Sequence, residues 1–142
     1  MVYDFKEVSK NYFEFTTRFG IKYAVKFKID TKIENYFERI FYPVDKYNTI
    51  EMYELTDKGD SFSVLSTVSK ITNYFLYNSN PDCITMYHIP TTKEEDKMDQ
   101  DPEYYEKNET KRKRAFRRFL DKSITDDYKI IQENSTTKII KK

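Results

Sequence analysis

The sequence predicts an α+β domain, in which an antiparallel sheet of about four to six strands carries two or three helices on one face. Some stretches alternate apolar and polar residues, as strands do, and others repeat apolar residues every three or four positions, as helices do. The two kinds of stretch are mixed without regular strand–helix–strand alternation, which favours an antiparallel sheet. The 142 residues fit one domain spanning 1–142, and no linker divides them.

The first part of the chain predicts a β-hairpin. Residues 12–17 have the composition of a strand, Gly20 can take the positive φ of a turn, and residues 21–29 alternate strictly. We expect the apolar side chains of the second strand to face the core and its lysines to face solvent. The apolar set is Ile21, Tyr23, Val25, Phe27 and Ile29. An RNA-binding sheet with stacking aromatics is the alternative, but these rings share their face with Ile and Val.

Residues 31–42 are compatible with two structures. Thr31 and Glu34 have the spacing of a capping box, and Pro43 would end a helix. Four apolar residues would then share one helical face: Ile33, Phe37, Ile40 and Phe41. The alternative is a strand, because the stretch is rich in Ile, Tyr and Phe. We take the helix as the expectation.

The middle of the chain predicts a strand at 48–55, a helix that follows Ser66-Thr67 and runs to about Asn78, and a strand at 83–89. The helix would turn four apolar residues inward, and the sequence from Asn78 to Pro81 would stop it. The inward residues are Val68, Ile71, Phe75 and Leu76.

The last third predicts an exposed acidic loop at 90–102 and a helix from Asp101 to about Lys122. Asp101 supplies an N-cap and is followed by Pro and Glu, which suit the first helical turn. Two short strands, 128–133 and 136–140, would form a hairpin, and residues 134–142 could instead fray.

The predicted helix is strongly polarised. Residues 94–109 hold eight acids and two lysines, whereas residues 111–122 hold seven bases and one acid. This distribution complements the helix dipole and is typical of a solvated, self-stabilised helix. The alternative is a contact surface for phosphate or carboxylate, since arginine suits both. The candidate binding residues are Lys111, Arg112, Lys113, Arg114, Arg117, Arg118 and Lys122. The acidic loop beside them favours a protein partner over RNA or DNA.

No catalytic motif, metal site or cofactor-binding loop is predicted. His88 is the only histidine, and strand alternation places it on the face opposite Cys83, so a Cys/His nucleophile pair is disfavoured. Two glycines are too few for a phosphate-cradling loop.

A single motif leaves a metal-dependent nuclease open as a third hypothesis. Pro81-Asp82, followed by Glu109-Thr110-Lys111, resembles the PD-(D/E)xK signature of nucleases, in which two carboxylates hold a divalent metal. Here Glu109 and Lys111 fall in a predicted helix instead of the strand that the signature requires.

The chain carries no sign of export or membrane insertion. The first residues lack a basic segment followed by an apolar one, and no apolar run reaches the roughly 18 residues that span a bilayer. We therefore expect a cytoplasmic protein with no membrane contact. The bias towards Lys, with 19 Lys and 6 Arg, and towards Tyr and Phe follows AT-rich codons and indicates an AT-rich bacterium or its phage.

Several weak features together resemble small uncharacterised α+β proteins of bacterial accessory genomes and phages. They are the aromatic hairpin at 12–27, the Thr67–Phe75 helix, the Ile84–Tyr87 strand, and Arg114-x-x-Arg117-x-Phe119. The resemblance implies a non-enzymatic accessory domain. The leading hypothesis is a phage- or mobile-element-encoded inhibitor or regulator of a host protein, such as a defence nuclease. The alternative is an RNA- or DNA-binding module that uses residues 111–122. A homodimer is compatible with either hypothesis.

Overall fold

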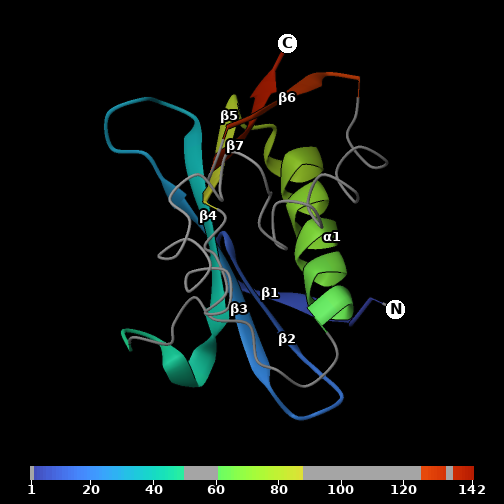
Figure 1. The fold of residues 1–142 in the computed structure, drawn as a ribbon. Helices are drawn as coiled ribbons and strands as arrows, with labels where there is room; N and C mark the ends of the chain where they lie inside the picture. The colour runs from blue at the N-terminus through green and yellow to red at the C-terminus, as the bar shows by residue number, and fades with distance from the viewer. Residues whose placement is uncertain (1, 50–60, 88–125, 134–135) are drawn as a thin grey trace, which may run out of the picture.

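The computed structural model describes residues 2–49, 61–87, 126–133 and 136–142, which form one sheet and one α-helix (Figure 1). The strands are β1 (Phe5–Ser9), β2 (Tyr12–Thr16), β3 (Lys22–Ile29), β4 (Tyr36–Pro43), β5 (Cys83–Tyr87), β6 (Tyr128–Gln132) and β7 (Thr136–Lys141). A 3-10 turn, η1 (Val44–Lys46), follows β4, and the helix is α1 (Ser61–Ser79). The strand order is β1-β2-β3-β4-β5-β7-β6, and α1 lies along one face of the sheet.

The expected fold class is wrong in its strand number, its strand direction and its helix number. The described residues form seven strands and one α-helix, where four to six strands and two or three helices were predicted. The sheet is mixed because β4 and β5 pair in parallel. A parallel pair needs a crossover connection, and α1 lies in the chain between these two strands. The helix predicted at 101–122 lies outside the described residues.

The helix predicted over 31–42 is also wrong, because Tyr36–Pro43 is a strand. The Asp30 carboxylate accepts hydrogen bonds from the N–H groups of Lys32 and Ile33, at 2.7 and 3.0 Å, and so builds a turn in place of a helical cap. These two donors hold the pKa of Asp30 below its ordinary value. Asn35 then takes a φ of 62°, which a helix cannot contain. The aromatic residues that follow suit a strand paired on both sides.

The predicted hairpin of 12–17 and 21–29 is confirmed as β2 and β3, with Phe13 opposite Val25 and a turn in which Gly20 has a φ of 78°. Tyr23, Val25 and Phe27 are buried against α1, and the lysines of β3 are exposed, as predicted. Ile29, by contrast, is exposed, because β3 ends there. Strand β1 was not predicted at all.

The helix predicted to end near Asn78 is confirmed, although α1 begins earlier, at Ser61. All four residues expected to face inward are buried. The last two predicted strands are also confirmed as an antiparallel pair, and β7 lies between β5 and β6. The strand predicted at 48–55 and the acidic loop at 90–102 lie outside the described residues, apart from positions 48 and 49 of the former.

Candidate functional site

The structure does not place the predicted contact surface. All seven candidate residues between 111 and 122 lie outside the described residues, and so does His88. The candidate site that the structure does describe lies elsewhere, between the first strand and the helix. We call it the β1–α1 groove and define it by its lining residues: Phe5, Lys70, Asn73, Tyr74, Leu76, Tyr77 and Asn78.

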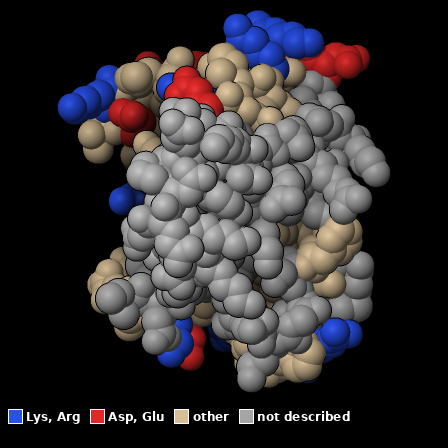
Figure 2. Space-filling model, in the orientation of Figure 1, with Lys and Arg blue, Asp and Glu red and all other residues tan. Residues whose placement is uncertain are grey.

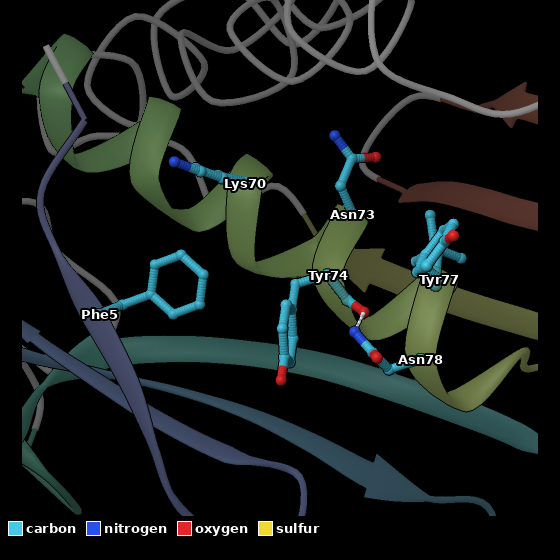
Figure 3. A pocket seen from close by; sticks show the side chains of 7 residues that line it. Phe5, Lys70, Asn73, Tyr74, Tyr77 and Asn78 are labelled. Atoms are coloured by element: carbon cyan, nitrogen blue, oxygen red, sulfur yellow. Dashed lines mark hydrogen bonds between the residues drawn. The ribbon is translucent and has the colours of Figure 1, made fainter.

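The β1–α1 groove is an open hollow of about 350 Å³ with mainly apolar walls. Figure 3 shows the Phe5 ring pointing from β1 towards α1, and the Tyr74 ring descending from α1 towards the sheet. Tyr74 meets Phe5 edge-on, at a centroid distance of 5.9 Å, and meets Phe13 in the same way at 5.7 Å. These contacts fix the Tyr74 ring, although 43% of the residue is exposed.

Tyr77 stands beside this fixed pair and is 82% exposed. It lies one helical turn from Asn73 and Tyr74, so the three side chains are neighbours along α1. Asn78 is held differently, because its side-chain N–H donates to the backbone carbonyl of Tyr74 at 2.8 Å. The groove therefore combines a rigid aromatic wall with one free-standing tyrosine.

The charge of the groove is low and positive. Helix α1 has 19 residues but only one charged side chain, Lys70, which is exposed at the rim of the groove. In Figure 2, described basic and acidic side chains lie near one another at the top and at the bottom of the view. A weakly charged aromatic surface is typical of a protein contact and lacks the dense positive charge of a phosphate-binding surface.

The groove adjoins an edge of the sheet. β1 is the first strand in the order, and within the described ranges no strand pairs with its outer side. Two hydrogen bonds flank β2 in the register that it shares with β3: the N–H of Thr17 donates to the carbonyl of Ile21, and the N–H of Phe27 donates to the carbonyl of Asn11. Because hydrogen-bonded pairs alternate along an antiparallel ladder, the odd-numbered residues of β2 bond to β3. The even-numbered residues of β2 therefore bond to β1, and Glu14 pairs with Lys6.

It follows that Phe5 and Glu7 direct their backbone N–H and C=O groups away from the sheet. The stretch of β1 edge that can pair with a further strand is limited at both ends. Beyond Glu7, a β-bulge interrupts the register before Ser9. Before Phe5, the N–H of Tyr3 already donates to the Thr67 hydroxyl of α1 at 2.9 Å.

Two other polar features lie among the described residues. Arg39 is 3% exposed between the sheet and α1, where its Nη1 donates to the Thr72 hydroxyl at 3.2 Å and its guanidinium lies 5.7 Å from the centre of the Phe41 ring. A second hollow of about 450 Å³ beside the turn at 30–35 mixes basic and acidic side chains, with Lys28 and Glu38 paired across β3 and β4. Neither feature groups side chains for catalysis.

Asp82, the one described carboxylate of the nuclease hypothesis, is engaged in holding the C-terminal strand. Its side chain forms an ion pair with the Lys141 ammonium at 3.4 Å. Its backbone N–H donates to the carbonyl of Asn35, and its carbonyl accepts from the N–H of Lys141. Glu109 and Lys111 lie outside the described residues. Among the residues that are described, no three His, Cys, Asp or Glu side chains gather to hold a metal ion. Within the same ranges, no helix is long and apolar enough to cross a membrane.

Sequence reasoning did not find this groove, although α1 contains a signal for it. Tyr74 and Tyr77 fall outside the inward face of the predicted helix, and a soluble helix normally carries charged residues there. Aromatic residues on the outer face of a helix with a single charge are a mark of a contact surface.

Comparison of the chain with protein-family models, with curated proteins and with solved structures finds no match.

Proposed function

We propose that this chain is a non-enzymatic interaction protein that binds another protein through the β1–α1 groove. The observation that carries the proposal is the pair of exposed tyrosines, Tyr74 and Tyr77, on a helix face with one positive charge and no acid. Tyrosine buries a large ring at low entropic cost and keeps a hydroxyl for a hydrogen bond, so it is enriched at the centres of protein interfaces.

The fixed geometry of the groove supports this proposal. Tyr74 is held by Phe5 and Phe13, so its ring loses little freedom when a partner covers it. A protein that covers a partner's surface can inhibit or regulate that partner without any catalytic group. Inhibition or regulation of a partner protein is therefore the role that we assign to the chain.

The test is affinity capture with two matched variants. Immobilised wild-type protein, Tyr77→Ala and Tyr87→Ala are exposed to nuclease-treated lysate of the source organism, and captured proteins are identified by mass spectrometry. Tyr87 is a suitable control because it is also an exposed tyrosine, 51% accessible, but lies on β5. We expect one protein to bind wild type and Tyr87→Ala, and to bind Tyr77→Ala about tenfold more weakly in calorimetry with purified partner.

Two results would contradict the proposal. Equal affinity of Tyr77→Ala and wild type for the captured protein would remove the groove from the interface. Material that is captured from untreated lysate but not from nuclease-treated lysate would favour the RNA- or DNA-binding alternative, whose affinity should also fall steeply as salt rises.

A further inference from the structure

Within the described parts of the chain, two residues at the outer edge of β1 have backbone groups that can pair with another chain. Phe5 and Glu7 point their N–H and C=O groups outward, and these are the groups that an added strand would bond. The Phe5 side chain also lines the β1–α1 groove, so the same residue presents hydrogen-bonding groups at the edge and an apolar surface beside it. An extended segment on this edge would place alternate side chains on the groove side.

The side chains of β1 disfavour a second copy of this chain as the occupant. Antiparallel pairing of β1 with itself, with Phe5 opposite Glu7 of the other copy, would place Lys6 directly opposite Lys6. Like charges directly opposite each other destabilise a strand pair. Centring the pair on Glu7 would oppose two carboxylates instead. Centring it on Phe5 would require Tyr3 to pair with Glu7, but the N–H of Tyr3 is already bonded to Thr67.

We propose that an extended segment of another protein adds to the outer edge of β1 as an antiparallel strand, with an apolar side chain in the β1–α1 groove. This inference rests on the proposed function and states how the partner binds. Charge complementarity sets the order of residues in the partner. A basic residue lies opposite Glu7, an acidic residue opposite Lys6, and an apolar or aromatic residue opposite Phe5.

The length of the edge determines how the binding energy is divided. The bulge after Glu7 and the bond from Tyr3 to Thr67 leave two residues for backbone pairing. Two residues can exchange about four hydrogen bonds with a partner strand. A contact this short needs a side-chain anchor, and the Phe5, Tyr74 and Tyr77 rings provide the surface for it. Backbone bonds would set the direction and register of the segment, and the groove would select its apolar residue.

The first experiment uses amide hydrogen exchange in the isotopically labelled, full-length protein. The probe is a terminally blocked peptide of ten residues, with the order basic–acidic–aromatic at its centre and threonine in the remaining positions. A second peptide, with the two charges exchanged, is the control. We expect saturating probe to slow exchange of the Phe5 and Glu7 amides at least tenfold. The Lys6 amide, which already bonds to β2, should change much less. The control peptide should bind at least fivefold more weakly.

The second experiment uses a pair of variants at Glu7. Proline at this position removes an outward N–H without removing a bond to β2, and edge strands tolerate proline there. Glu7→Ala is the matched control, because both variants lose the carboxylate that accepts the Asn11 N–H at 3.1 Å. We expect Glu7→Pro to bind the probe at least fivefold more weakly than Glu7→Ala, with similar melting temperatures. If Glu7→Pro does not fold, the exchange experiment decides alone, since it uses the wild-type chain.

The outcomes separate this inference from the proposed function. Strand addition is overturned if the probe leaves the Phe5 and Glu7 amides unprotected, or if folded Glu7→Pro binds as tightly as Glu7→Ala. In either case, a partner that is lost in Tyr77→Ala still supports protein binding at the groove. Conversely, the probe could protect both amides while the captured partner binds Tyr77→Ala as tightly as wild type. In that case strand addition at the edge stands and the proposed function fails.

Discussion

The phenyl rings of Phe27 on β3 and Phe75 on α1 stack face to face, with their centroids 3.9 Å apart and their planes 4° apart. Both residues are buried, and the edge of the Phe37 ring meets Phe75 from the neighbouring strand at 5.0 Å. Phe75 is thus packed against two adjacent strands at once. This contact fixes the position of α1 on the sheet, and with it the position of the helix residues that line the β1–α1 groove.

Replacing Phe75 by alanine should destabilise the protein strongly. The substitution removes a buried ring and leaves a cavity between α1 and the sheet, which typically costs about 3–5 kcal/mol. Urea denaturation followed by circular dichroism measures the change. Tyr77→Ala, on the exposed side of the same helix, should stay within about 0.5 kcal/mol of wild type. Equal stability of the two variants would show that Phe75 does not hold the helix.

Thr72→Val tests the contact with the buried Arg39. The Thr72 hydroxyl accepts from Arg39 at 3.2 Å and donates to the carbonyl of Val68 at 2.8 Å. Valine keeps the shape but removes the acceptor, so we expect a loss of about 1–3 kcal/mol in unfolding free energy. Ser69→Ala is the control on the same helix. The buried Ser69 hydroxyl has no hydrogen-bond partner in the described parts of the chain, and its removal should leave stability unchanged or raised. Equal effects of the two variants would contradict the assignment.

The stability of the protein should fall in strong alkali. Burial and the hydrogen bond to the Glu14 carboxylate, 3.0 Å long, raise the pKa of Tyr12 above its ordinary value of 10.0. Burial also raises the pKa of Tyr128. Above about pH 10 the unfolded chain loses these protons while the folded chain keeps them, so the contribution present at lower pH is lost as pH rises. Denaturant titrations at several pH values measure this slope. Tyr12→Phe should flatten it, and an unchanged slope would exclude Tyr12 as its source.

Cys83 should be inert in the folded protein. It is 2% exposed on β5, and burial raises the pKa of its thiol, so little of the reactive thiolate forms near neutral pH. We expect a thiol reagent at pH 8 to modify the native protein about 100-fold more slowly than the urea-unfolded protein. Similar rates in the two states would mean that β5 opens readily.

The sequence predicted the elements in which local pattern and final environment agree. β3 alternates because one face packs on α1 while the three lysines of the other face are exposed, and α1 repeats its apolar residues because one side lies on the sheet. The segment at 36–43 lacks that agreement. β4 is paired on both sides, so Phe37, Arg39 and Phe41 face α1 while Tyr42 is buried on the opposite face. Because apolar residues occupy both faces of β4, the sequence does not alternate between apolar and polar residues. Its apolar residues then happen to recur at the spacing of a helix.

The candidate site was less predictable, because it depends on contacts between distant segments. β1 has five residues, four of them exposed, so no apolar pattern marks it as a strand. Its place in the sheet depends on pairing with β2 and on Phe5 meeting Tyr74, which lies 69 positions later in the sequence. The exposure of Tyr77 likewise follows from where α1 lies on the sheet.

The parallel pair of β4 and β5 also determines the order in which the sheet can assemble. β1 to β4 lie in chain order and are joined by short turns, so their pairing needs only local loop closure. β5 can reach β4 only after the chain that contains α1 has folded back, and within the described sheet β7 and β6 attach through β5. We therefore expect refolding to protect the amides of β2 and β3 first and those of β5 and β7 last. Partial unfolding should release the C-terminal strands together, as one cooperative unit.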